Sequence, residues 1–231
     1  MKRIVVLTGA GISAESGIKT FRDADGLWEG HDVMEVASPQ GWQKNRNLVQ
    51  DFYNQRRRQL KEVEPNAGHL ALVDLEEKYD VQIITQNVDD LHERAGSSQI
   101  VHLHGELNKV RSTLDPSLVY DWDKDVTDSD KCEKGAQLRP HIVWFGEMVP
   151  MLETAAQLCA EAEIILIIGT SMQVYPAASL VGYAPPFAPV YYIDPRPSIN
   201  YELGRSKALT VVEETATVGV AQIVKKLLAE V

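Results

Sequence analysis

The sequence predicts an α/β protein with a doubly wound, mostly parallel, Rossmann-like sheet that carries a small inserted lobe. Three observations predict this fold. Short apolar runs rich in branched residues recur along the chain, helix-like stretches separate most of them, and the runs lack the alternation that half-exposed strands show. Continuous apolar strands are typical of a parallel sheet that helices cover on both faces. Alternating strand and helix signals favour the doubly wound arrangement.

Six segments carry the strand signal, and we expect all of them in the parallel sheet. They are RIVVLT (3–8), VQIIT (81–85), QIVHLH (99–104), HIVWF (141–145), EIILIIG (163–169) and APVYYID (188–194). Branched and aromatic residues, which favour strands, make up much of each segment.

Helical patterns lie between these strands. In the segment 65–79, Asn66 is suited to an N-cap, and we expect Leu70, Val73 and Leu75 on one apolar stripe. The same pattern recurs at 151–162 and 218–231.

Two segments do not follow the alternation of strands and helices. Residues 18–60 hold a Gly-rich, charged stretch and then a helical pattern at 47–60. Residues 106–140 contain almost no core-forming run, and 121–131 is densely acidic. We therefore expect one domain over 1–231, with a small lobe formed by these two insertions.

Composition excludes several classes of protein. The chain has 231 residues and a net charge of −10, whereas a nucleic-acid binder carries a basic face. Cys132 and Cys159 give no disulfide framework and indicate a reducing compartment. The run Ile4–Leu7 is too short for a signal peptide, and Ile164–Ile168 is a buried strand, too short to span a membrane. We expect a cytoplasmic protein that binds neither nucleic acid nor membrane.

A glycine-rich loop, TGAGISAESGIKTFRD (8–23), follows the first strand. Gly9, Gly11 and Ala14 satisfy the loose dinucleotide pattern G-x-G-x-x-G/A, although a plain strand-to-helix turn explains them equally well. Such a loop offers backbone N–H groups and a helix N-terminus to a pyrophosphate. A dehydrogenase needs a second strand about 20 residues further on, ending in Asp or Glu. The window 19–35 has no strand-like run, so the sequence does not favour a redox enzyme.

Seven motifs in a fixed order are far more specific than this loop. They are GAGIS (9–13), ESGI (15–18), FRD (21–23), TQNVD (85–89), HLHG (102–105), RPHIVWFGE (139–147) and GTSMQVYPAA (169–178). Together they resemble the sirtuin family, the NAD-consuming protein lysine deacylases, from residue 3 to about 225. In that family the acyl-lysine carbonyl oxygen attacks C1′ of the nicotinamide ribose, nicotinamide leaves, and the acyl group ends on ADP-ribose. The resemblance implies that NAD is a co-substrate here.

The resemblance assigns catalysis to His104 and Asn87. His104 matches the general base toward a ribose hydroxyl, a task that suits an imidazole because its pKa lies near neutrality. His102 lies on the same strand face, and we expect it to be structural. Asn87 and Asp89 match residues that orient the nicotinamide ribose and carboxamide at a strand's carboxyl end. A cap on the following helix is an alternative role for Asp89.

The resemblance also assigns the contacts with NAD. They fall to Gly9, Ala10, Gly11, Ile12, Ser13, Glu15, Phe21, Arg22, Trp28, Gln86, Asn87, Val88, Asp89, Gly169, Thr170, Ser171, Asp194 and Ala216. Phe21 and Arg22 match a flap that closes over the reacting ribose. Asp194 stands where the family usually has an asparagine on the adenosine ribose, and Ala216 matches by spacing alone.

Seven further residues match the family's substrate contacts. They are Ala37, Tyr53, Arg56, Phe145, Gly146, Glu147 and Val174. The last four match two edges between which the peptide lies as an added strand. Tyr53 and Arg56 are three residues apart and share a helix face, as in the class III branch, where the pair binds the carboxylate of succinyl- or malonyl-lysine. Ala37 matches the small residue that widens that pocket. A solvated arginine run is the alternative.

The family's structural zinc site is not retained. Many sirtuins hold Zn²⁺ with two C-x-x-C pairs, and those positions here are Ser112, Asp115, Lys131 and Lys134. Cys132 is the single thiol nearby and falls out of register. One thiolate with scattered carboxylates does not make a tetrahedral zinc site, so we expect no metal.

The resemblance therefore implies an NAD-dependent deacylase that removes succinyl, malonyl and also acetyl groups from protein lysines. An ADP-ribosyltransferase that uses the same NAD-cleaving site is the main alternative. A catalytically silent NAD-binding regulator is a second, and a redox enzyme a third.

Overall fold

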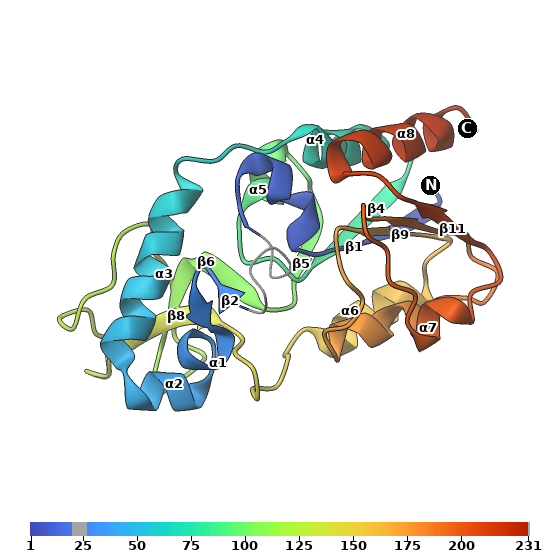
Figure 1. Cartoon of the computed structure of the whole chain (residues 1–231). Helices are drawn as coiled ribbons and strands as arrows, with labels where there is room; N and C mark the ends of the chain where they lie inside the picture. The colour runs from blue at the N-terminus through green and yellow to red at the C-terminus, as the bar shows by residue number, and fades with distance from the viewer. Residues whose placement is uncertain (20–26, 231) are drawn as a thin grey trace.

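The large domain is built on a six-stranded parallel sheet in the order β11-β10-β9-β1-β4-β5 (Figure 1). The computed structural model describes residues 1–19 and 27–230. The strands of this sheet are β1 (Arg3–Thr8), β4 (Asp80–Thr85), β5 (Ile100–His102), β9 (Ile164–Ile168), β10 (Val190–Ile193) and β11 (Leu209–Val212). The predicted parallel sheet is confirmed for five of the six segments that carry the strand signal.

Helices cover both faces of this sheet, which confirms the doubly wound fold. On one face α4 (Ala67–Leu75) and α8 (Ala216–Leu228) pack over a core that includes Ile4 and Val6. On the other face α6 (Leu152–Ala160), η4 (Ala177–Tyr183) and α7 (Tyr201–Gly204) lie over a core that includes Val5 and Leu7. Successive residues of β1 thus face opposite layers, and all four are buried. Figure 1 shows the two helical layers above and below the sheet.

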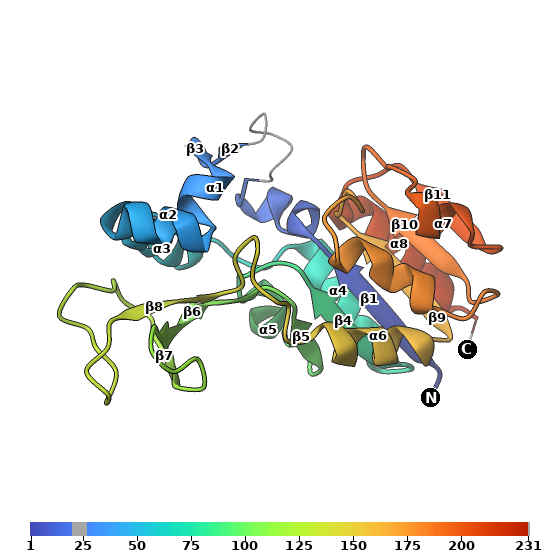
Figure 2. The same ribbon diagram turned by 90° about the horizontal axis from the view of Figure 1, so that it is seen from below.

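The small lobe combines helices and an antiparallel sheet. Its elements are β2 (Leu27–Trp28), β3 (His31–Asp32), α1 (Val33–Val36), α2 (Pro39–Lys44), α3 (Arg46–Leu60), β6 (Gly105–Ser112), β7 (Val119–Asp121) and β8 (Leu138–Ile142). The three longer strands pair in the order β7-β6-β8. Buried Arg57 on α3 donates to the Leu107 carbonyl, and Asn54 bonds both the N–H and the carbonyl of Val126. These bonds join two segments that are far apart in the sequence, and Figure 2 shows the lobe beside the large sheet.

The expected strands differ from the observed ones in two ways. The run 141–145 does not join the parallel sheet, because β8 pairs antiparallel with β6, with Gly105 opposite Ile142. The buried and half-buried residues of β8 alternate along Leu138–Ile142, as in a strand with one covered face. Five strands were missed, namely β2, β3, β6, β7 and β11. Of these, β6 lies in a segment with almost no core-forming run, and β11 is a short, partly exposed edge strand.

The apolar stripe of α4 is also displaced from the expected one. Asn66 is the N-cap, and its side chain accepts from the N–H of Gly68, as predicted. The buried face, however, carries Leu72 and Leu75, whereas Leu70 is 50% exposed. Leu70 and Leu72 are separated by about 200° around the helix axis, so they cannot face the same core.

No helix within the described residues is long and apolar enough to cross a bilayer.

The helix α5 (Leu91–Ala95) is among the shortest in the described residues. It ends at Gly96, whose backbone adopts the left-handed conformation.

Two fully buried histidines join α4 to α5. The ring of His69 on α4 meets the ring of His92 on α5 edge to face, with centroids 5.0 Å apart. His92 Nε2 lies 3.1 Å from Thr8 Oγ1, and His69 Nδ1 accepts from the N–H of Asn66 at 3.3 Å. Burial lowers the pKa of His69 to about 4 and that of His92 well below its ordinary value. Both rings are therefore neutral in the folded protein at neutral pH.

This pair predicts a loss of stability in acid. The unfolded chain binds a proton at each histidine near pH 6.5, whereas folded His69 does so only near pH 4. Neutral His69 therefore contributes fully to the free energy of unfolding above pH 6.5. As the pH falls toward 4, about 3 kcal/mol of that free energy is lost, because the folded-state pKa is about 4 and the unfolded one about 6.5. Urea unfolding between pH 7.5 and 4.5 measures this slope. The variant His69→Gln is expected to flatten it, and an unchanged slope would contradict the assignment.

Candidate active site

Two glycine-containing loops, one after β1 and one after β9, contact each other through backbone atoms at the carboxyl ends of these strands. The N–H of Gly11 donates to the Gly169 carbonyl at 2.8 Å, and Gly169 has φ +61°. A Cβ on Gly11 would lie 2.5 Å from the Gly169 Cα, so only glycines allow this approach. The helix expected after these glycines is replaced by two short 3₁₀ turns, Ala10–Ile12 and Ala14–Ser16.

A buried polar network lies beside the first glycine loop. Asn87 Nδ2 donates to Ser13 Oγ at 3.1 Å, and Ser13 Oγ donates to Asp89 Oδ2 at 3.0 Å. Asp89 Oδ1 also accepts from the N–H of Leu91 at 3.2 Å, at the start of α5. Burial raises the pKa of Asp89 to about 6, against the lowering effect of these two donors. Asp89 thus bonds both Ser13 of the glycine loop and the first turn of α5, and its role toward the nicotinamide ribose stays a prediction.

His104 is held as a neutral base. Its Nδ1 lies 3.1 Å from the Gln86 carbonyl oxygen, and because a carbonyl only accepts, Nδ1 carries the proton. The lone pair is then on Nε2. Burial lowers the pKa of His104, while the Gln86 carbonyl opposes that shift, so the ring is neutral at neutral pH. A neutral imidazole with a fixed tautomer can take a proton from a hydroxyl.

His102 has different surroundings from His104. Its Nδ1 lies 3.4 Å from the Asn87 carbonyl, and its Nε2 lies 2.6 Å from Glu93 Oε1. Burial alone would lower the pKa of His102, but the Glu93 carboxylate outweighs burial and raises it. This ion pair fits the structural role expected for His102.

The second glycine loop is tied to the segment after β4 that carries Asn87. Gln86 Nε2 donates to Thr170 Oγ1 at 3.1 Å, and the N–H of Gly169 donates to the Ile193 carbonyl. Asp194 follows β10, is buried, and accepts from the N–H of Arg196 at 2.8 Å. The remaining residues expected near NAD in these loops are Ala10, Ile12, Val88 and Ser171. Phe21 and Arg22, the expected flap, lie outside the described residues.

Glu15 makes contacts that its expected role near NAD does not include. Its carboxylate accepts from the N–H of Thr217 at 2.9 Å and from Thr217 Oγ1 at 2.7 Å. Ala216 and Thr217 begin α8, so the charge of Glu15 stabilises the positive end of that helix.

The residues expected to bind the acyl group share one side of the small lobe. Ala37 and Tyr53 are buried, and Trp28 packs edge-on against Tyr53 with centroids 5.9 Å apart. The Tyr53 hydroxyl accepts from Trp144 Nε1 at 3.0 Å, and burial raises its pKa. Trp144 was not predicted to contribute, although the motif RPHIVWFGE contains it.

Arg56 is a half-buried cation with no counter-ion at contact distance among the residues that the structure describes. Its Cζ lies 4.9 Å from the centroid of the Phe52 ring, and its Nε is buried. Within residues 1–19 and 27–230, Nε has no hydrogen-bond partner and no carboxylate forms an ion pair with the guanidinium. Burial lowers the pKa of Arg56, while the more distant charges of Glu29 and Asp51 oppose that shift. Such a group attracts a carboxylate.

The expected peptide edges are exposed. Phe145 is 43% and Val174 40% exposed, and Gly146 between the strand and Glu147 has φ +88°. The N–H of Phe145 already donates to the Ala37 carbonyl at 2.9 Å, which links this edge to a residue expected beside the acyl group.

Glu147 is bonded within the lobe itself. Its carboxylate accepts from Arg139 Nη1 at 2.7 Å, from Arg111 Nη2 at 3.2 Å and from the N–H of Trp144 at 2.8 Å. The guanidinium of Arg139 stacks on the Trp144 ring, 3.3 Å from its centroid. Glu147 thus supports the edge that Phe145 presents. Sequence reasoning did not predict Arg111 or Arg139 as partners of Glu147.

Hydrogen bonds and one ion pair occupy the positions of the family's zinc ligands. Ser112 Oγ accepts from the N–H groups of Leu114 and Asp115 at 3.1 and 3.2 Å. Lys134 Nζ lies 2.8 Å from Asp115 Oδ2. Cys132 is buried in a small apolar cluster with Val110, Val126 and Leu138.

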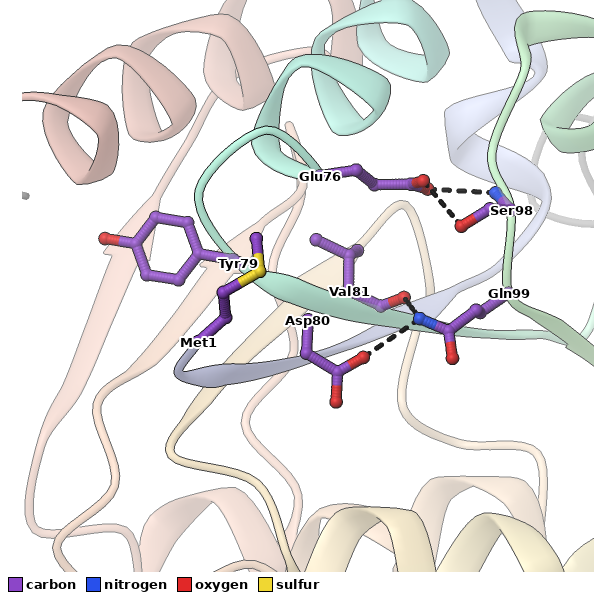
Figure 3. Close-up of a pocket in the computed structure, with 7 residues that line it drawn as sticks. All are labelled: Met1, Glu76, Tyr79, Asp80, Val81, Ser98 and Gln99. Atoms are coloured by element: carbon purple, nitrogen blue, oxygen red, sulfur yellow. Dashed lines mark hydrogen bonds between the residues drawn. The ribbon is translucent and has the colours of Figure 1, made fainter.

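A hollow of about 440 Å³ lies at the opposite end of the sheet, near the start of β4 (Figure 3). Its polar groups bond one another: Glu76 accepts from Ser98, and Gln99 Nε2 donates to Asp80 Oδ1 at 2.9 Å. Ligands of open α/β sheets bind at the carboxyl ends of the strands, where the residues described above lie.

Comparison with known proteins identifies the family of the chain. The Sir2 family profile matches residues 9–176. A Helicobacter pylori protein named NAD-dependent protein deacylase is 67% identical over 196 residues, covering 85% of this chain and 86% of that protein. A protein of the same name from Bacteroides thetaiotaomicron is 53% identical and covers 99% of this chain and 98% of its own length.

Solved structures agree in fold as well as in sequence. The ADP-ribose complex of a variant Sir2 homologue superposes with a TM-score of 0.88 at 37% identity, covering 99% of this chain and 94% of that one. A Sir2 homologue in complex with NAD gives 0.86 at 37% identity, with coverage of 99% and 90%. A Sir2 protein bound to an acetylated peptide gives 0.76 at 26% identity, with coverage of 98% and 92%. The resemblance predicted from the seven motifs is confirmed, and the chain belongs to the Sir2 family.

Proposed function

We propose that this chain is an NAD-dependent protein lysine deacylase whose general base is His104. The observation that carries the proposal is the neutral His104 ring, fixed by the Gln86 carbonyl at the carboxyl end of the sheet. Its relatives carry the name NAD-dependent protein deacylase, and a Sir2 neighbour binds NAD.

The residues present fit NAD as the second substrate. The close approach of Gly11 and Gly169 keeps side chains out of the space between the two glycine loops, and the Ser13–Asn87–Asp89 network offers a fixed amide and carboxylate for ribose hydroxyls. NAD supplies the ribose carbon that accepts the acyl oxygen. His104 Nε2 takes a proton from a ribose hydroxyl while Nδ1 stays bonded to Gln86. The expected products are nicotinamide and O-acyl-ADP-ribose.

The proposed acyl groups are succinyl and malonyl, with acetyl also accepted. Support comes from Arg56, a half-buried cation with no ion-pair partner among the described residues and with a buried, unpartnered Nε. Ala37 is buried in the same apolar cluster as Tyr53, and its methyl group is the small side chain expected beside a bulky acyl group. An acyl carboxylate would supply the charge that Arg56 lacks.

A matched set of acetyl-, malonyl- and succinyl-lysine peptides with NAD tests this function. We expect release of nicotinamide with all three, transfer of each acyl group to ADP-ribose, and the highest kcat/KM for the two acidic groups. Mass spectrometry of the peptide and nucleotide products shows whether the acyl group or the ADP-ribose has been transferred. ADP-ribose attached to the protein acceptor, with the acyl-lysine unchanged, would favour the transferase alternative instead.

The small lobe is proposed to fold without zinc. The Lys134–Asp115 ion pair and the bonds to Ser112 stand where thiolates would hold the metal. Because a structural zinc site couples the metal to folding, its removal would lower the melting temperature. We expect dialysis against EDTA to leave the melting temperature and deacylation unchanged relative to protein kept in zinc-free buffer. A fall in melting temperature on chelation would contradict this proposal.

A further inference from the structure

A cluster of metal-ligating side chains lies where the two lobes join, outside the residues used above for NAD and acyl-lysine. It contains Glu93 on α5, His102 at the end of β5, and Glu106 at the start of β6. One ligand atom from each lies within 4.8 Å of those of the other two. Figure 2 shows α5 and β5 beside β6. We propose that Glu93, His102 and Glu106 form a binding site for one zinc-class divalent cation.

The distances suit a metal ion. Zinc binds imidazole nitrogen and carboxylate oxygen at about 2.0–2.2 Å, so two of its ligands are at most about 4.4 Å apart. Ligand atoms within 4.8 Å of one another can therefore converge through small side-chain rotations, without backbone movement. Three protein ligands leave a fourth position for water, as in open zinc sites.

The imidazole of His102 is oriented for this role. Its Nδ1 lies 3.4 Å from the Asn87 carbonyl, which fixes the ring and directs Nε2 toward Glu93 Oε1, 2.6 Å away. Histidine ligands usually donate their second ring N–H to a carbonyl or carboxylate in this way. On binding, the proton between Nε2 and Glu93 leaves to solvent, and both atoms become ligands.

Positive charge already gathers at the cluster. Lys109 Nζ lies 2.9 Å from Glu106 Oε2, and the His102–Glu93 pair shares a proton. A divalent cation would replace that proton and the Lys109 ammonium, and the half-exposed lysine would swing into water. The shared proton and the Lys109 ammonium take two positive charges away, and the divalent cation brings two, so the formal charge of the cluster is unchanged.

The donor set selects the metal. Two carboxylates with one imidazole suit Zn²⁺ and its borderline neighbours Co²⁺ and Ni²⁺, whereas Mg²⁺ and Ca²⁺ prefer oxygen ligands alone. Glu93 and His102 belong to the large domain and Glu106 to the small lobe, so the ion would tie the two lobes together. Partly exposed carboxylates make the site exchangeable, in contrast to a folding zinc site.

Isothermal titration of untagged, EDTA-treated protein with ZnCl₂ tests the site, together with the melting temperature. We expect one zinc per chain and a rise in melting temperature, since the unfolded chain lacks the site. Glu93→Gln and Glu106→Gln are each expected to weaken binding at least about tenfold. Lys109→Met, which removes the competing ammonium, is expected to strengthen it.

The matched control is Glu76→Gln, which replaces a partly exposed carboxylate that accepts from Ser98 and is not a member of the cluster; this variant should bind zinc as the wild type does. Cys132→Ser should also leave binding unchanged. Three results would overturn the proposal: no binding at about 100 μM zinc, glutamine variants that bind as tightly as wild type, or loss of binding in Cys132→Ser. None of these readouts depends on deacylation, so the site can fail while the proposed function stands.

Discussion

Replacement of His104 by alanine is expected to lower kcat for deacylation by about 10²–10⁴-fold, the usual worth of a positioned general base. The Nε2 lone pair is available because the Gln86 carbonyl holds the proton on Nδ1. Alanine removes this base and leaves both glycine loops and the Ser13–Asn87–Asp89 network in place. Steady-state release of nicotinamide from an acyl-lysine peptide measures the loss.

Two controls separate catalysis from folding and binding. The melting temperature and the affinity for NAD of His104→Ala should match those of the wild type, because within the described part of the chain the ring contributes one hydrogen bond and no ion pair. Near-normal turnover in this variant would show that His104 is not the general base.

Replacement of Arg56 by methionine is expected to lower kcat/KM for succinyl- and malonyl-lysine by about 10- to 100-fold. Charge-assisted hydrogen bonds contribute about 1.5–3 kcal/mol, and each 1.4 kcal/mol corresponds to a factor of ten. Acetyl-lysine has no distal carboxylate, so its removal should change far less. Methionine keeps the length of the aliphatic chain over Phe52, which preserves the packing that Arg56 makes there.

Arg58→Met is the matched control for this variant. Arg58 lies on the same helix but is exposed, and it interacts with Asp51 and Asp125 at the surface. The Arg58→Met variant should have unchanged kcat/KM for the succinyl-, malonyl- and acetyl-lysine substrates. Equal losses for acidic and acetyl substrates in Arg56→Met would mean that the arginine supports only the helix.

The parts of the fold that could be predicted are those with a local cause. The strands β1 and β9 are buried on both faces, so the runs Ile4–Leu7 and Ile164–Ile168 are continuously apolar and identify a parallel sheet. The run at 141–145 has a similar appearance, yet β8 is covered on one face only. A short apolar run does not reveal which partner a strand has, because pairing depends on segments far away in the sequence.

The candidate site could be predicted as a set of motifs but not as a network. His104, Asn87 and Asp89 stand out in the sequence because their side chains carry the chemistry. The group that fixes the His104 tautomer is a backbone carbonyl, which any residue at position 86 would provide. The partners of Glu147 likewise come from two strands of the small lobe, so only the tertiary structure brings Arg111 and Arg139 together.

The small lobe's origin in two separated segments has a consequence for synthesis on the ribosome. The helix α3 ends at Leu60, whereas β8, which completes the antiparallel sheet of the small lobe, ends at Ile142. At 5–20 residues per second, the roughly 80 residues between them take about 4–16 s to translate. For about the first half of that interval Phe52 and Tyr53 lack both β6 and β8, and for the rest of it they lack β8. The nascent chain therefore carries an aromatic face that chaperones can bind before the lobe closes.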